Sequence, residues 1–244
     1  MDQIANELSE YLIQKFVTVP PNERFLVGIS GVPASGKSSL SKLLVSKINS
    51  RLDKQINDID GRSQSTSIMV GLDGWHLTRA QLDAFADPKL AHDRRGAHWT
   101  FDGESYLEFV RELRKPLVSS ETSHPNIIYA PSFSHELKDP TPRSVHVYPH
   151  HRVVIIEGLY TFLSIAPWRE AGELLDERWW VDISEEDAER RLVPRHLKSG
   201  ICKDLNEAEW RARENDAPNG RFIQENMLTP TRVIQSVDDP EVIA

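Results

Sequence analysis

Gly31-Val32-Pro33-Ala34-Ser35-Gly36-Lys37-Ser38 is the stretch of this chain that decides its fold, because it fills every position of the pattern G-x-x-x-x-G-K-[ST]. A short apolar run of strand type, Phe25-Leu26-Val27-Gly28-Ile29-Ser30, comes directly before it. After it, leucine and isoleucine recur at helical spacing between Leu40 and Ile48. The segment therefore predicts a strand, a glycine-rich loop and a helix in succession.

A loop in this position is suited to binding a polyphosphate such as that of ATP. Its backbone N–H groups and the positive end of the following helix point at one small volume. Lys37 is expected to reach the β- and γ-phosphates, and the Ser38 hydroxyl is expected to bind Mg²⁺. The predicted nucleotide contacts come from Gly31, Val32, Pro33, Ala34, Ser35, Gly36, Lys37, Ser38 and Ser39.

Apolar periodicity predicts the elements on both sides of this loop. Residues 1–20 carry an amphipathic helix that Pro20-Pro21 ends. Strands are predicted over 68–72, 153–156, 179–183 and 231–235, and helices over 103–113, from Ser184 onward and over 206–215. Asp102, Ser184 and Asn206 are the expected N-caps of these three helices.

The stretch 116–151 is less regular and holds six prolines. Two strand-like pieces remain inside it, at 126–130 and 144–148. Because proline is excluded from central strands, they are interpreted as a hairpin excursion at the margin of the sheet. A linker between domains is the alternative.

Strands that alternate with helices predict an α/β fold of the P-loop NTPase type, in which helices flank a doubly wound, mostly parallel sheet. The chain of 244 residues is long enough for one large domain or two small ones, and one domain over 1–244 is favoured. Within it, 116–151 forms the hairpin excursion and 185–216 a basic helical lid.

Composition excludes several classes of partner. Acidic side chains outnumber basic ones by 37 to 29, and there is no basic run, so nucleic acid is not expected to bind. The single cysteine, Cys202, cannot form an internal disulfide, and the N-terminus lacks the pattern of a secretory signal. No apolar run approaches membrane-spanning length. These features predict a cytoplasmic protein without a membrane partner.

Two carboxylates are expected to join the loop at one edge of the sheet. Ligands bind beyond the carboxyl ends of parallel strands, and Asp73 and Glu157 each stand where a predicted strand ends. Phosphoryl transfer needs a group that orients the attacking hydroxyl, for which Asp73 is the candidate base, and a metal-side carboxylate, for which Glu157 is the candidate. In the alternative interpretation, Asp73 only caps a helix and Glu157 only pairs with a surface cation.

The cations that phosphoryl transfer also needs are found on the basic helix. Arg191 and Arg195 lie four residues apart and so share one helix face, while Arg190 is expected to point elsewhere. If the helix closes over the nucleotide, both guanidinium groups approach the β- and γ-phosphates. A solvated basic face, paired with Glu186, Asp187 and Glu189, is the alternative.

In their order along the chain, these motifs resemble the phosphoribulokinase, uridine kinase and pantothenate kinase family of P-loop kinases. The resemblance rests on Gly31 to Ser38, Leu72-Asp73-Gly74-Trp75-His76, Thr100-Phe101-Asp102, Pro131-Ser132-Phe133-Ser134-His135, Val153 to Gly158 and Arg190 to Gly200. Arg95-Gly96 and Asn215-Asp216-Ala217-Pro218-Asn219 look closest to a fungal and bacterial fructose-kinase-like branch.

The resemblance implies an ATP-dependent kinase that phosphorylates a hydroxyl of a sugar, a pantothenate-like or a nucleoside-like metabolite. It implies that Asp73 is the base and that Ser38 and Glu157 hold magnesium. It also implies that Arg191 and Arg195 belong to the lid. For the acceptor it implies His135, with Arg95 and Tyr129 as further contacts. Ala130 stands near the place where uridine kinases carry a ribose-binding acid, which counts against a nucleoside.

Several alternatives remain at the level of sequence. The chain is either a kinase, a P-loop hydrolase or switch protein, or a nucleotide-binding protein without activity. Trp75 and Trp99 contact the acceptor or pack in the core. The edge hairpin is a possible site for a homodimer contact.

Overall fold

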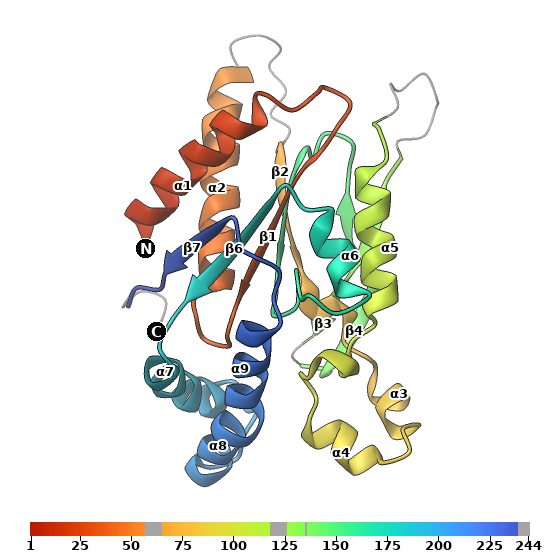
Figure 1. Cartoon of the computed structure of the whole chain (residues 1–244), viewed down its shortest axis with the longest axis vertical. Helices are drawn as coiled ribbons and strands as arrows, with labels where there is room; N and C mark the ends of the chain where they lie inside the picture. The colour runs from red at the N-terminus through yellow and green to blue at the C-terminus, as the bar shows by residue number, and fades with distance from the viewer. Residues whose placement is uncertain (57–64, 118–125, 135, 239–244) are drawn as a thin grey trace.

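The central strand of the fold is β1 (Phe25–Gly31), in which all seven residues are buried. The computed structural model describes residues 1–56, 65–117, 126–134 and 136–238. In these residues, β1 belongs to a five-stranded parallel sheet of order β2-β5-β1-β6-β7 (Figure 1). The other strands are β2 (Ser67–Gly71), β5 (Val153–Glu157), β6 (Glu177–Asp182) and β7 (Arg232–Gln235). The predicted α/β fold with a parallel sheet is confirmed.

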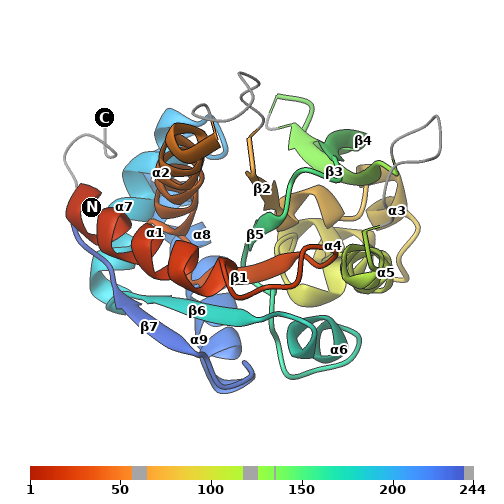
Figure 2. The same ribbon diagram turned by 90° about the horizontal axis from the view of Figure 1, so that it is seen from above.

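Helices cover both faces of this sheet because side chains alternate along its strands. Val27 and Ile29 of β1 pack in the cluster that holds α1 (Asp2–Phe16) and α2 (Lys37–Ile56). Leu26 lies in the cluster on the other face, with α5 (Gly103–Arg114) and α6 (Trp168–Glu173). Figure 2 shows these two pairs on opposite sides of the strands. None of the helices in the described parts of the chain is long and apolar enough to span a membrane.

The hairpin predicted within 116–151 is present as a separate two-stranded antiparallel sheet beside β2. Its strands are β3 (Ile128–Ser134) and β4 (Asp139–Val147), and they pair from Ile128 with Val147 to Ser134 with Asp139. Both strands extend beyond the predicted pieces, because proline at 131, 140 and 142 is tolerated in a two-stranded edge ribbon.

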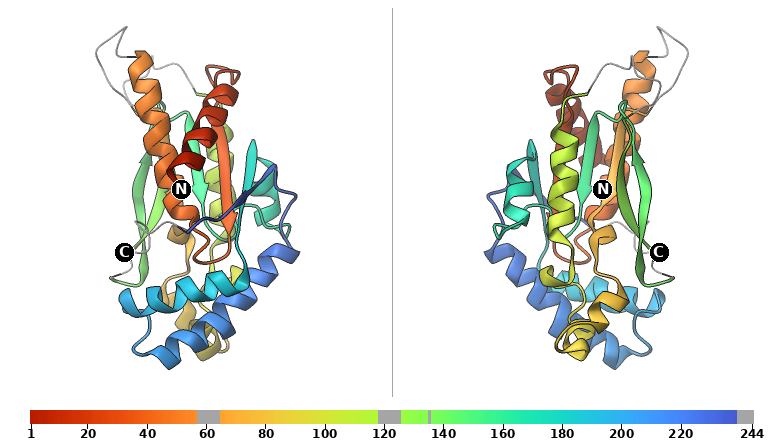
Figure 3. Two further views of the ribbon diagram at one scale, coloured as in Figure 1. Left: turned by 90° about the vertical axis from the view of Figure 1, so that its left-hand side faces the viewer. Right: turned by 90° about the vertical axis from the view of Figure 1, so that its right-hand side faces the viewer.

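The remaining short elements gather at the end of the molecule where the parallel strands end (Figure 3). On one side they are α7 (Glu185–Lys198), α8 (Leu205–Arg211), the π-helical turn η3 (Ala212–Asp216) and α9 (Ala217–Glu225). On the other side they are η1 (Leu72–Trp75), α3 (Arg79–Asp83), α4 (Pro88–Asp93) and η2 (His98–Thr100). The active-site candidates lie at this end.

Asp102 and Ser184 cap α5 and α7 as predicted, because their side chains accept backbone N–H groups of the first turn. The prediction for 206–215 was wrong in its cap and its extent. Asp204 caps α8, since its Oδ1 accepts the Glu207 N–H at 2.9 Å. The helical path then continues through η3 and α9 to residue 225, with Pro218 just beyond the π-helical turn.

Candidate active site

The phosphate-loop candidate connects β1 to α2 and has the backbone geometry that its glycines predict. Ala34 and Gly36 have positive φ angles of 63° and 89°. A side chain on Gly31 would lie 2.8 Å from the Val181 carbonyl oxygen, so only glycine fits beside β6. The Ser236 hydroxyl donates to the Ser35 carbonyl at 2.7 Å, which fixes the loop from the segment after β7.

The loop, Asp73 and Glu157 converge as the parallel sheet predicts. Glu157 ends β5, which lies between β1 and β2, and it is in register with Ile29 and Gly71. The Ser38 hydroxyl donates to Glu157 Oε2 at 3.0 Å. Asp73 follows β2 in η1, with about half of its side chain exposed. Glu157 is therefore hydrogen-bonded to the residue that ends the phosphate-loop motif.

Burial shapes the electrostatics of this group. It lowers the pKa of Lys37, and the nearby charges of Glu157 and Asp73 oppose that change. It also raises the pKa of Glu157, against the attraction of Lys37 and together with the repulsion of Asp73. One ammonium group and two carboxylates therefore share a small volume at the ends of β1, β2 and β5.

Ser38 and Glu157 are chemically suited to hold Mg²⁺. Magnesium takes oxygen ligands and is usually bound by one or two carboxylates together with substrate phosphates, not by an all-protein cage. The Ser38–Glu157 contact supplies one hydroxyl and one carboxylate next to the phosphate loop. Within the described ranges there is no cluster of three or more His, Cys, Asp or Glu side chains that would form a complete cage.

The two predicted lid arginines line a cavity of about 470 Å³ over the loop, together with Gly36 to Ser39. Arg191 donates from Nη1 to the Ala34 carbonyl at 3.2 Å and to Ser236 Oγ at 2.9 Å. Its Nη2 also lies 2.8 Å from Asp238 Oδ1. Arg191 is therefore already in contact with the loop.

The expectation that Arg190 points elsewhere was wrong. Arg190 lines the same cavity, and its guanidinium pairs with Asp187 at 2.8 Å and with Asp238 at 2.9 Å. The missed residues are those after β7, with Ser236 bound to the loop, Val237 in the cavity wall and Asp238 bound to both arginines. Their position just beyond a strand that ends at this edge was the available signal.

The candidate acceptor contacts are only partly brought together. Arg95 holds the hairpin, since its Nη1 donates to the Lys138 carbonyl at 2.5 Å and its Nη2 lies 3.1 Å from Asp139 Oδ1. Tyr129 lies on β3 with the Arg143 guanidinium 3.7 Å above its ring. His135 lies outside the described residues.

The aromatic alternatives are resolved for one of two tryptophans. Trp75 is 3% exposed and packs against Tyr106 and Phe109, so it belongs to the core. Trp99 is 37% exposed and packs on Phe85. Its location in the wall of a surface groove leaves it accessible.

The Asn215 to Asn219 segment contacts the turn that holds Arg94, Arg95 and Gly96. Its Asn215 amide donates to the Arg95 carbonyl at 3.3 Å, and Arg94 Nη2 donates to Asn219 Oδ1 at 3.3 Å. The Tyr160 hydroxyl donates to the Gly96 carbonyl of the same turn at 2.7 Å. Burial raises the pKa of Tyr160, the charge of Arg94 opposes that effect, and the charges of Asp216 and Asp73 add to it.

Comparison with known proteins places this geometry among kinases. No family model matches the chain. A Schizosaccharomyces pombe protein named "Putative uridine kinase" is 36% identical over 215 residues, which cover 88% of this chain and 84% of that protein. The Aspergillus versicolor ATP-dependent kinase-like protein notR' is 45% identical over 64% of this chain and 89% of its own length. The ATP-dependent kinase YFH7 of Saccharomyces cerevisiae is 31% identical, and the match covers 75% of this chain but only 59% of YFH7.

Solved structures agree with this placement. The YFH7 crystal structure superposes with a TM-score of 0.81 at 24% identity, over 96% of this chain and 99% of that one, which shows a common fold. A Silicibacter protein named "putative fructose transport system kinase" gives a TM-score of 0.74 at 27% identity, over 94% of this chain and 98% of its own. Together with the phosphate loop and the strand-end carboxylates, these likenesses show that the chain belongs to the family of ATP-dependent P-loop kinases that act on small molecules.

Proposed function

We propose that this kinase transfers the γ-phosphoryl group of ATP to a hydroxyl of a small metabolite bound between the strand ends and the hairpin, with Asp73 as the base. The observation that carries the proposal is the meeting of three chain segments. Ser38 of the loop contacts Glu157 at 3.0 Å, and Lys37 lies in the field of both Glu157 and Asp73. A cradle for phosphates thus lies beside two carboxylates with different surroundings.

The residues divide the work of the reaction as follows. Loop N–H groups and Lys37 bind the β- and γ-phosphates, and Arg191 and Arg195 offset the charge on the transferring group. The half-exposed Asp73 accepts the proton of the acceptor hydroxyl. The hydroxyl oxygen bonds to the γ-phosphorus at the same time, and the bond from the γ-phosphorus to the β–γ bridging oxygen breaks to release ADP. When held by Ser38 and Glu157, Mg²⁺ neutralises part of the phosphate charge.

The acceptor belongs to the class of small hydroxylated metabolites. Arg95, the hairpin and the Asn215 to Asn219 segment form the walls proposed to select it. Residue 130 is alanine, so it offers no acid to bind a ribose, which supports a sugar or a pantothenate-like compound over a nucleoside. The kinase names of the relatives mention uridine and fructose, so both belong in a first test.

The experiment is a screen of hydroxylated metabolites with γ-labelled ATP, Mg²⁺ and the full chain. Label is expected to move to one acceptor class, and Asp73→Asn is expected to slow that transfer about a hundredfold or more while the affinity for Mg·AMP-PNP stays near the parent's. Phosphate release that proceeds equally well without any acceptor would establish a hydrolase in place of a metabolite kinase. Nucleotide binding without turnover on any compound would instead indicate a binding protein.

A further inference from the structure

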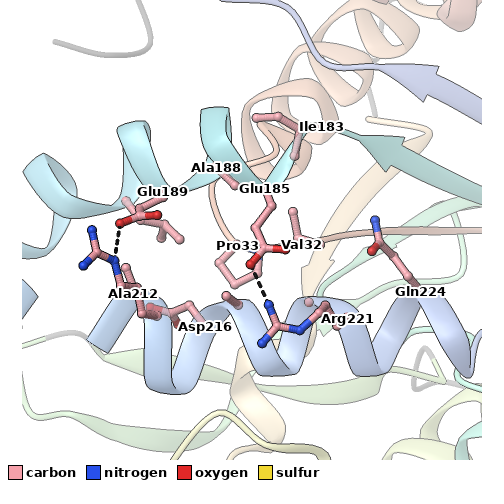
Figure 4. A pocket seen from close by; sticks show the side chains of 14 residues that line it. Val32, Pro33, Ile183, Glu185, Ala188, Glu189, Ala212, Asp216, Arg221 and Gln224 are labelled. Atoms are coloured by element: carbon pink, nitrogen blue, oxygen red, sulfur yellow. Dashed lines mark hydrogen bonds and ion pairs between the residues drawn. The ribbon is translucent and has the colours of Figure 1, made fainter. Parts of the chain in front are cut away.

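Helix α7, which carries the lid arginines, is joined to the η3–α9 segment by three side-chain pairs. Two of them lie at the surface, where Glu185 Oε1 lies 2.6 Å from Arg221 Nη1 and Glu189 Oε1 lies 2.8 Å from Arg213 Nε. They flank a cavity of about 220 Å³ whose wall includes Val32-Pro33 of the phosphate loop (Figure 4). Exposed ion pairs contribute little to stability, so these two pairs hold α7 only weakly.

The third pair is buried and sits at the other end of α7. His196 Nε2 lies 2.7 Å from Asp216 Oδ2, and the two side chains are only 6% and 13% exposed. The carboxylate can only accept when it is ionised, so the ring donates from Nε2. This hydrogen bond therefore connects the C-terminal end of α7 to the π-helical turn, whose last residue is Asp216.

Arg195 directly precedes His196 in α7. Arg195 lines the cavity over the loop, yet it forms no ion pair with any residue in the described part of the chain. Pro194 lies inside α7 and removes one backbone hydrogen bond from this turn. The direction of Arg195 thus depends on what holds the end of the helix.

The segment around Asp216 packs beside the phosphate loop. A side chain on Gly220 would lie 3.0 Å from Val32 Cγ1, so α9 packs directly on the loop. Asn219 Nδ2 donates to Asn215 Oδ1 at 3.4 Å across the turn, and both side chains are buried. Asp216 lines the cavity that Val32 and Pro33 of the loop also line, and Arg195 lines the cavity over the loop together with Lys37.

We propose that Asp216 is a positioning residue, which accepts a hydrogen bond from His196 and so aligns Arg195 with the γ-phosphate. The π-helical turn gives this carboxylate its place, because it shifts the side chains between α8 and α9 out of ordinary helical register. The inference rests on the proposed role of Arg195 as a phosphate-binding cation. In this proposal Asp216 supports the binding of the nucleotide through Arg195 and does not contact the nucleotide itself.

The test measures the affinities for Mg·AMP-PNP and Mg·ADP by calorimetry, so that it needs no acceptor. Arg195→Ala is expected to weaken AMP-PNP binding about tenfold, or about 1.4 kcal/mol, and ADP binding much less. Asp216→Ala is expected to give about a fivefold loss with the same preference for the triphosphate, which is the size of one lost hydrogen bond. The Arg195→Ala/Asp216→Ala double variant is expected to be no weaker than Arg195→Ala alone.

Three further variants complete the design. Asp216→Asn keeps an acceptor for His196 and is expected to retain most of the affinity. His196→Asn disrupts the His196–Asp216 hydrogen bond from the α7 side. It replaces Asp216→Ala in the test if that variant does not fold. Glu189→Gln breaks a surface pair between the same elements and is the matched control, expected to bind both nucleotides as the parent does.

The outcomes separate this inference from the proposed function. If Arg195→Ala binds AMP-PNP like the parent, the phosphate-binding role of Arg195 is lost. If Arg195→Ala is impaired but the double variant shows additive losses, Asp216 has no positioning role and the proposed function stands. Equal losses in Asp216→Asn and Asp216→Ala would show that the charge of Asp216 acts directly, which also overturns the inference.

Discussion

Replacing Glu157 by glutamine is expected to raise the stability of the nucleotide-free kinase while it removes the proposed metal-side carboxylate. Burial raises the pKa of Glu157, and the attraction of Lys37 does not cancel that effect. A raised pKa means that the folded protein disfavours the ionised form. At neutral pH the carboxylate therefore opposes folding, whereas glutamine keeps its shape and accepts the Ser38 hydrogen bond without the charge.

The expected gain is about 1 kcal/mol, the size typical of one stabilising substitution at a functional site. For a chain of this length, about 1 kcal/mol shifts Tm by roughly 2–4 °C. The sign also depends on pH. Because the pKa is raised in the folded state, the contribution of Glu157 to stability is fully present below its ordinary value of 4.5 and is lost as the pH rises through the folded pKa. The advantage of Glu157→Gln should thus be largest near pH 7.5 and vanish toward pH 4.

Thermal melts of both proteins from pH 4 to pH 8 test this expectation. Glu177 is the matched control of opposite sign, because burial acts to raise its pKa but hydrogen bonds from Thr231, Tyr11 and Trp179 together bring it below the ordinary value. Glu177→Gln should lose about 2 kcal/mol at every pH above the ordinary pKa of 4.5, and this loss should shrink only as the pH falls below that value. A Glu157→Gln protein that melts below the parent at pH 7.5 would show that the attraction of Lys37 outweighs burial, contrary to the reasoning.

Four further outcomes are expected. Lys37→Ala should weaken Mg·AMP-PNP binding about ten- to a hundredfold in calorimetry, since it removes charged hydrogen bonds to the phosphates. Asp73→Asn should lower turnover of the identified acceptor about a hundredfold or more at unchanged nucleotide affinity; near-parent turnover would exclude it as the base. His135→Ala should raise the acceptor KM more than it alters ATP affinity in steady-state kinetics. Asp204→Ala should cost about 1 kcal/mol in thermal melts through the lost cap of α8, and an unchanged Tm would contradict that role.

The sheet and the donor side of the site were predictable from sequence because their signals are local. Each strand is a short run of apolar residues that ends at a polar residue or a glycine, and parallel strands end at one edge. That logic alone brings Asp73 and Glu157 to the loop. By contrast, α3, α4 and α6 have at most six residues each, which is too short for an apolar stripe to recur.

The acceptor side could not be predicted because its residues are placed by tertiary contacts. Arg95 was expected to contact the acceptor, but its position is set by the Lys138 carbonyl and Asp139, which lie 43 and 44 residues away in sequence. Asp216 depends on a π-helical turn, and no periodicity marks such a turn. A motif such as Asn215 to Asn219 can therefore be noticed in the sequence without its role being visible.

The charges at the strand ends connect stability with function. Without nucleotide, burial disfavours the charge of Lys37 and that of Glu157 alike. Lys37 and Glu157 compensate each other only in part, and phosphates beside Lys37 and a cation beside Glu157 would each add further opposite charge. In the proposed reaction, binding of Mg·ATP stabilises the buried charges of Lys37 and Glu157 together. Part of the affinity for Mg·ATP therefore comes from the unfavourable burial of these two charges in the nucleotide-free protein. The parent should consequently gain more Tm from Mg·AMP-PNP than Glu157→Gln does, even though the variant melts higher without ligand.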